Sequence, residues 1–303
     1  MQRREFLRTS CTAGLAALTA GAAYGQEKLP GESEAAYRQR MARLRAFRGP
    51  LPGESEAAYR ERMSNLRATA AGAMAAEYFE LRRYEIETEA QKAGFDAFAQ
   101  EAAIPALNRA GIEPVGVFYS WEDVSPIYVL LRHKSLPSFV TLTQRLAEDE
   151  EFLQAGADFL NAPASKPGFK RMQVQFMQAF DGMPHLETPI DAPGRVFQLR
   201  TYESPSVKTG LKKIEMFNTA EIDIFRKTGL NPVFFGQTLS GEKMPNLTYM
   251  LVFNSMDERQ ANWKRFGGDP DWQALRAKPE YADKEILCGI TNLYLKPADY
   301  SQI

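Results

Sequence analysis

Two short segments carry the residue types that suit recognition of a polar ligand. Residues 79–85 read FELRRYE, and residues 197–203 read FQLRTYE. Each places an arginine two residues before a tyrosine, so both side chains lie on one face of a strand. A guanidinium binds carboxylates or carbonyl oxygens, and a tyrosine hydroxyl can hydrogen-bond to the same group. The sequence therefore predicts a candidate ligand pocket built from Arg82, Tyr84, Arg200, Tyr202 and Glu80.

These residues also fit a purely structural network. Strand alternation predicts that Phe79 and Leu81 face the helices, while Arg82 and Tyr84 face the opposite side, buried between two sheets. A buried guanidinium needs an anion or several acceptors. Glu80 can supply the anion in the first segment, and a glutamine replaces it in the second. An Arg–Glu–Tyr network across a pseudo-twofold axis and an anion-binding site are both open at this point.

The two histidines offer little metal or cofactor chemistry. His133 ends a predicted strand, and His185 lies in a predicted linker. Neither has a second histidine or a cysteine at metal-ligand spacing, so we predict no metal and no cofactor. Haem with His133 as its axial ligand is the alternative. The sequence contains no Ser-His-Asp motif, Walker loop or glycine-rich dinucleotide turn.

Three further residues have predicted structural roles. Asp269 precedes a Pro-Asp-Trp run and is expected to cap a helix that carries Trp272 into the core. Cys288 lies in an apolar run and is expected to be a buried strand cysteine rather than a nucleophile.

The two candidate segments belong to a longer internal repeat. At the same offset of 118 residues, GIEPV at 111–115 matches GLNPV at 229–233. DEEF at 149–152 then matches DPDW at 269–272. Three blocks in one order indicate a duplicated domain.

Hydrophobic periodicity predicts the order strand, helix, strand, strand, helix, strand in each half. In the first half, these six elements are expected at 78–86, 89–109, 114–121, 126–133, 137–160 and 170–180. In the second half, they are expected at 195–203, 207–228, 232–239, 247–254, 256–277 and 285–295. This order is typical of a ferredoxin-like sheet with both helices on one face. We predict an α+β fold of two tandem ferredoxin-like βαββαβ repeats, at 77–181 and 194–298, packed as an intramolecular dimeric α/β barrel with a helical N-terminal segment.

The residues before the repeats have a different character. Two arginines at positions 3 and 4 precede an uncharged stretch at 12–23 and small residues at a cleavage-like exit. Residues 1–25 are therefore expected to be a Tat-type signal peptide, which predicts a periplasmic or secreted bacterial protein. Residues 26–70 contain a 22-residue duplication, with 29–41 returning as 51–63. This segment is interpreted either as an amphipathic helical linker that binds a partner or as a duplicated solvated helix.

The second repeat resembles the NIPSNAP family. The resemblance is carried by residues 197–202, 229–233 and 269–272, and it extends over 78–296. The first repeat departs from the pattern, with Arg83 in place of Thr201. The resemblance implies the dimeric α+β barrel fold and no settled reaction.

Composition narrows the function further. The formal net charge is −1, which argues against nucleic-acid binding. No transmembrane helix is expected in the mature chain, and a homo-oligomer is possible. The sequence predicts an exported tandem NIPSNAP-like protein that binds a small ligand or a protein. The alternative is a cofactor-poor oxidoreductase or isomerase acting on a hydrophobic carbonyl or quinone-like substrate, polarised by arginine and tyrosine.

Overall fold

The structure is a computed structural model that describes residues 55, 76–123 and 125–303. The predicted signal peptide and all of the duplicated segment at 26–70 except Ser55 lie outside these residues, so those predictions are untested. Within the described part of the chain, no helix is both long enough and apolar enough to cross a membrane.

Each half alternates strands and helices in the predicted order. The first half contains β1 (Tyr78–Glu85), α4 (Glu89–Phe98), η1 (Ala99–Ala103), α5 (Ile104–Arg109), β2 (Val115–Ser120), β3 (Ile127–His133), α6 (Leu136–Val140), α7 (Leu142–Ala147), α8 (Glu150–Ala155), α9 (Ala157–Leu160) and β4 (Arg171–Ala179). The second half contains β5 (Val196–Glu203), α10 (Val207–Met216), η2 (Phe217–Glu221), α11 (Ile222–Thr228), β6 (Asn231–Ser240), β7 (Asn246–Phe253), α12 (Met256–Gly268), α13 (Pro270–Arg276), η3 (Pro279–Tyr281), α14 (Asp283–Ile286) and β8 (Gly289–Pro297).

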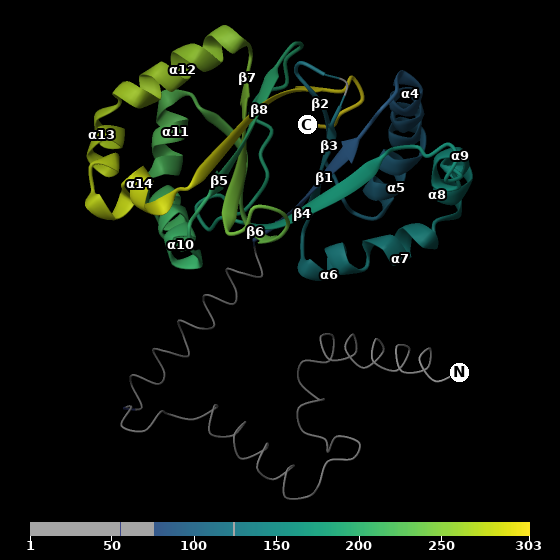
Figure 1. Ribbon diagram of the computed structural model, residues 1–303, viewed down its shortest axis with the longest axis horizontal. Helices are drawn as coiled ribbons and strands as arrows, with labels where there is room; N and C mark the ends of the chain where they lie inside the picture. Colours follow the sequence, from purple (N-terminus) through teal and green to yellow (C-terminus); the bar gives the residue numbers. More distant parts are fainter. Residues whose placement is uncertain (1–54, 56–75, 124) are drawn as a thin grey trace, which may run out of the picture. The chain divides into compact units, whose positions relative to one another are not determined.

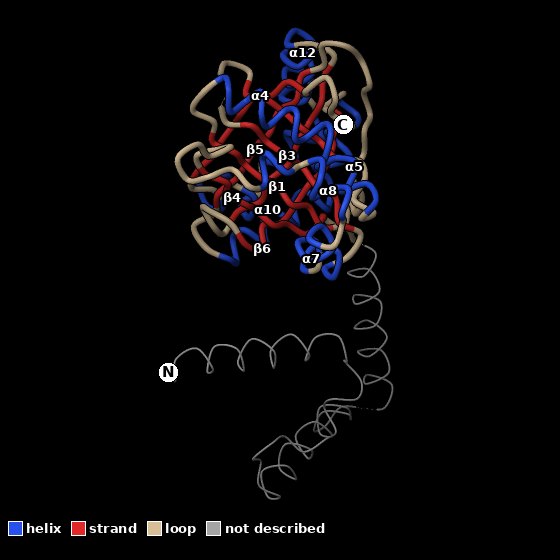
Figure 2. The backbone as a smooth tube through the Cα atoms, turned by 90° about the vertical axis from the view of Figure 1, so that its right-hand side faces the viewer, coloured by secondary structure: helices blue, strands red, loops and turns tan. Residues whose placement is uncertain are grey.

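The eight strands form one closed antiparallel barrel in the order β1-β3-β2-β8-β5-β7-β6-β4. The pairs β2–β8 and β4–β6 join the two halves edge to edge. The helices of the first half cover one side of the barrel, and those of the second half cover the opposite side (Figure 1). Figure 2 shows the strands at the centre with helices outside them. The prediction of a mixed α+β fold is therefore confirmed. The two expected four-stranded sheets, however, are joined at both edges into one closed barrel.

The interior of the barrel contains an apolar cluster that both halves supply. Phe79 of β1 packs on Phe234 of β6, with ring centroids 5.0 Å apart. Phe118 of β2 packs on Phe197 of β5 at 4.8 Å. The same buried cluster includes Leu81, Leu130, Met177, Leu199, Met250, Val252 and Leu295.

This packing corrects the predicted orientation of the first strands. Phe79 and Leu81 face the barrel interior instead of the helices, and Arg82 and Tyr84 face the helix layer. Closure creates an enclosed apolar volume, which Phe79 and Leu81 fill, while Arg83 on the same face of β1 donates to Gln173 and Glu85. Arg82 goes to the outer face, where its head can find polar partners.

The long helix of each half contains a π-helical turn at the same repeat position. Residues 99–103 and 217–221 are 118 residues apart, the offset of the sequence repeat. Each helical segment is followed by a glycine with positive φ, Gly111 at +77° and Gly229 at +81°. Glycine suits this left-handed C-terminal position because it has no Cβ. The two halves therefore share local backbone detail as well as topology.

The shared interior predicts that the two halves unfold together. We expect Phe79→Ala to destabilise the protein by about 3–5 kcal/mol, because Phe79 is fully buried. Denaturant unfolding should show a single transition shifted as a whole. The control Val140→Ala changes a side chain that is 63% exposed and should cost under about 0.5 kcal/mol. Two separate transitions, with only one of them shifted, would contradict a common core.

Candidate functional site

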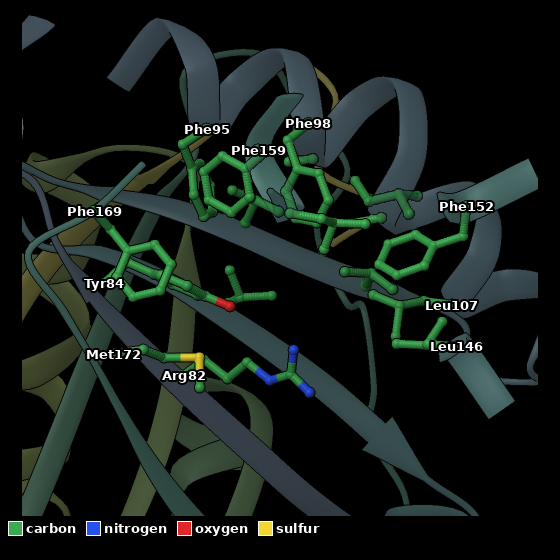
Figure 3. A pocket seen from close by; sticks show the side chains of 17 residues that line it. Arg82, Tyr84, Phe95, Phe98, Leu107, Leu146, Phe152, Phe159, Phe169 and Met172 are labelled. Carbon is green, nitrogen blue, oxygen red and sulfur yellow. The ribbon is translucent and has the colours of Figure 1, made fainter. Parts of the chain in front are cut away.

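A cavity of about 220 Å³ lies between the barrel and the helices of the first half. Strand β1 contributes Arg82 and Tyr84 to its wall, and the helices contribute mostly aromatic and aliphatic side chains (Figure 3). The lining residues are Arg82, Tyr84, Phe95, Phe98, Ala99, Ala103, Ile104, Leu107, Val115, Val117, Val129, Leu146, Phe152, Phe159, Leu160, Phe169 and Met172. Arg82 is the one charged residue in this set, so it places a single cation in an otherwise apolar space.

A chain of polar contacts holds Arg82 in place. Its Nε donates to Glu80 Oε1 at 2.6 Å, and the other carboxylate oxygen lies 3.0 Å from His133 Nε2. His133 Nδ1 is 3.2 Å from Ser138 Oγ. The sequence offered no Ser-His-acid motif, yet folding brings Ser138, His133 and Glu80 into one line. Phe139 and Phe176 pack edge-on against the imidazole, which is buried.

These contacts fix the charges at the site. Burial alone would raise the pKa of Glu80, but the hydrogen bond from His133 and the charge of Arg82 hold it below its ordinary value. Burial alone would lower the pKa of Arg82, but Glu80 and Tyr84 raise it above its ordinary value. Arg82 therefore stays a cation, with a carboxylate on the Nε side of its guanidinium.

His133 does not fit a haem ligand. Both of its ring nitrogens have hydrogen-bond partners, and its side chain is fully buried. An axial ligand needs one nitrogen free to reach the iron. His185 lies in the segment between the halves, where its Nδ1 is 3.3 Å from Glu77 Oε1. No cluster of three or more metal-ligating side chains occurs among residues 76–123 and 125–303.

The other predicted pair, Arg200 and Tyr202, lies on the far side of the barrel. Three strands separate β1 from β5 in either direction around the sheet. The expected network across a pseudo-twofold axis is therefore wrong, because closure places the two arginines under different helix layers. Arg200 Nη2 donates to the Tyr202 hydroxyl at 3.0 Å, and its guanidinium lies 4.7 Å from the ring centre of Trp263.

The space equivalent to the cavity is filled in the second half. Ala99 corresponds to Phe217, Ala103 to Glu221 and Val129 to Tyr249, by the repeat offset and strand register. All three replacements are larger and fully buried or nearly so. Tyr249 donates to the Tyr202 hydroxyl at 2.9 Å. Three size differences at matched positions thus account for a cavity in one half and packed side chains in the other.

A buried ion pair completes the filled side. Lys213 takes the place of Phe95, and its Nζ lies 3.1 Å from Glu221 Oε2, with both side chains 2% exposed. Burial raises the pKa of Glu221, and Lys213 opposes that change. These charges neutralise each other inside the second half.

The remaining predicted residues have structural positions. Asp269 caps α13, since its Oδ1 accepts from the backbone nitrogens of Asp271 and Trp272. Trp272 is buried and packs on Phe266 at 4.4 Å between ring centroids. Cys288 differs from expectation, because β8 begins one residue after it and its side chain is exposed.

Sequence reasoning missed the aromatic and alanine residues of the cavity. Phe98 and Phe159 come from α4 and α9, and Ala99 comes from the π turn. A usable signal was present in the repeat itself, because aligning the helices at the offset of 118 pairs Ala99 with Phe217.

The Glu80 contacts predict a specific pH dependence. The pKa of Glu80 is lower in the folded protein than in the unfolded chain, where it is about 4.3. The ionised carboxylate therefore stabilises the fold fully above about pH 4.3, and this stabilisation is lost as the pH falls through the pKa of the folded protein. Glu80→Gln should lower the unfolding free energy by about 2–3 kcal/mol at pH 7 and by less at about pH 3.5.

Denaturant unfolding at both pH values measures the difference. The control Glu87→Gln removes an exposed carboxylate paired with Lys170 and should change the free energy by under about 0.5 kcal/mol. A Glu80→Gln effect of equal size at both pH values would contradict the assignment.

Comparison with known proteins adds a family match for the second half. No curated protein matches the chain. Among solved structures, a proposed monooxygenase from Fusobacterium nucleatum shares 9% identity over 74% of this chain and 93% of its own, with a TM-score of 0.49. An anthrone oxidase-like protein shares 11% sequence identity over 75% of this chain and 93% of its own, with a TM-score of 0.44. A NIPSNAP-like domain protein from Burkholderia xenovorans shares 17% sequence identity over 35% of this chain and 88% of its own, with a TM-score of 0.32.

Likenesses at these identities and scores carry no information on activity. The NIPSNAP family model, in contrast, matches the sequence directly, over residues 197–302. The second half of this chain therefore contains a NIPSNAP domain.

Proposed function

We propose that the first half binds one compact apolar ligand through an acidic or carbonyl oxygen at Arg82. The observation that carries this proposal is the difference between the halves: Ala99, Ala103 and Val129 leave a cavity where Phe217, Glu221 and Tyr249 fill the matching space. Packed interiors rarely retain voids of this size, and a large apolar pocket with a few polar groups is the usual form of a ligand site.

The dimensions of the cavity favour a small ligand. Its volume of about 220 Å³ is below the roughly 300–1,000 Å³ of pockets that enclose drug-sized molecules. Five phenylalanines contribute to the lining, and their ring faces suit aliphatic chains and flat rings alike. A medium-chain carboxylate or a small aromatic acid meets these requirements.

The polar end of the ligand is set by Arg82 and Tyr84. Glu80 accepts from the Nε of Arg82 and the Tyr84 hydroxyl also interacts with the guanidinium, so the remaining Nη donors are available to a ligand. In a cavity of low polarity, a charge-assisted hydrogen bond from such a group is stronger than in water. The Tyr84 hydroxyl lies on the same side of the cavity (Figure 3). Binding without turnover is the function that this arrangement supports best.

We further propose that both halves are NIPSNAP repeats and that the first has diverged into the binding half. The matched π turns, the common topology and the repeated sequence blocks support this proposal. Export by a Tat-type signal at residues 1–25, to the periplasm or the outside of the cell, is proposed on the sequence pattern alone.

Filling the cavity tests the proposal directly. Ala99→Phe introduces the side chain that the second half carries at Phe217, and we expect it to abolish octanoate binding in isothermal titration calorimetry. Overpacking costs about 1–3 kcal/mol, so circular dichroism should confirm that the variant is folded. Gln100→Phe places the same ring at the exposed neighbouring position and should leave binding intact. Unchanged octanoate affinity in folded Ala99→Phe would remove the cavity from consideration.

Replacing the cation tests the polar contact. Arg82→Met should weaken octanoate binding by about 10- to 100-fold, because a hydrogen bond to a charged group contributes about 1.5–3 kcal/mol. Binding of the neutral analogue octanamide should change by less than about threefold. Arg200→Met, the matched change in the filled half, should affect neither ligand. Equal losses for octanoate and octanamide in Arg82→Met would indicate a general packing defect rather than recognition of the acid.

A further inference from the structure

Two stacked rings separate the cavity from a groove on the outer surface. Phe98 and Phe159 lie with ring centroids 4.2 Å apart and planes 11° from parallel. An outer groove of about 690 Å³ runs between α4 and the segment at 155–168. Within the described chain, Phe98 and Phe159 are the residues that line both spaces. They therefore form the wall between an inner and an outer compartment.

Two glycines of the groove fit closely around this wall. A Cβ at Gly168 would lie 2.8 Å from the Phe159 ring, and a Cβ at Gly156 would lie 3.0 Å from the Phe98 ring. Both glycines line the groove. Each ring thus reaches the backbone on its outer side, and side chains at these positions would push the rings inward.

The wall lies on the side of the cavity away from the cation. Figure 3 shows Arg82 on the barrel side and both rings on the helix side. Phe98 also packs on Phe152, and Phe159 on Phe95 and Phe169. A ligand whose acid reaches Arg82 directs its tail into this aromatic group, and a longer tail has to displace it.

We propose that the Phe98–Phe159 pair sets the maximum length of the ligand. This inference rests on the proposed function. Compact acids fit inside the wall, and tails that extend past it are rejected because they would separate packed rings. Removing one ring joins the cavity to the groove, and the site then accepts elongated acids.

A series of alkanoates from hexanoate to tetradecanoate tests the proposal by calorimetry on the full-length protein. The wild type should bind tetradecanoate at least about tenfold more weakly than octanoate. Phe159→Ala should bind tetradecanoate at least about tenfold more tightly than the wild type does, with octanoate changed by less than about threefold. Phe98→Leu, which shortens the other ring, provides a second test if Phe159→Ala does not fold.

Two controls separate the wall from general loosening. Leu107→Ala removes a side chain that lines the inner cavity but not the outer groove, so it should not improve tetradecanoate binding. Ala97→Trp, added to Phe159→Ala, fills the groove from an exposed position and should cancel the gain.

The possible failures are distinguishable. Octanoate binding with no preference over tetradecanoate in the wild type would overturn the length limit and leave the proposed function standing. The same holds if both wall variants fold but keep the wild-type selectivity. Absence of octanoate binding to the wild type would overturn the proposed function, and the length limit with it.

Discussion

Closure of the barrel around a shared apolar interior is the constraint on which the rest of the structure depends. Neither half can enclose Phe79 or Phe197 alone, because the rings that cover them, Phe234 and Phe118, come from the other half. Phe79 and Leu81 of β1 fill the apolar part of the interior, so strand alternation places Arg82 on the outer face. The candidate site is consequently located between barrel and helices, and each half has its own.

One position on each first strand shows how the two sites diverged. Glu80 contacts Arg82 and His133, whereas the equivalent Gln198 accepts hydrogen bonds from Trp263 at 2.7 Å and from Arg259 at 3.1 Å. A buried polar side chain has to be satisfied, so a change from glutamate to glutamine requires new partners. Because Gln198 turns to Trp263, Arg200 Nε has no hydrogen-bond partner. The first half keeps its arginine paired and facing a cavity.

The sequence was sufficient for the order of strands and helices, because that order depends on hydrophobic periodicity. It was insufficient for the orientation of β1. Alternation distinguishes faces when one is solvated, but both faces of β1 are largely covered. The site was predictable in part: Arg82 and Tyr84 line the cavity, and Glu80 supports Arg82. The prediction that Arg82 and Arg200 share one site was wrong, because the order of strands around a closed barrel depends on tertiary structure and not on local sequence.

The pairing of a packed half with an open one explains how the first half can hold a cavity. An apolar cavity of 220 Å³ that was fully closed and empty would cost on the order of 5 kcal/mol at about 24 cal/mol per Å³, which is the upper limit for this partly open space. That is comparable to the whole stability of many domains, at about 5–15 kcal/mol. In this barrel the second half is packed with Phe217 and Tyr249, and it shares the interior with the first. The stability of the packed half supports the open one, and a ligand that occupies the cavity restores contacts that its smaller side chains omit.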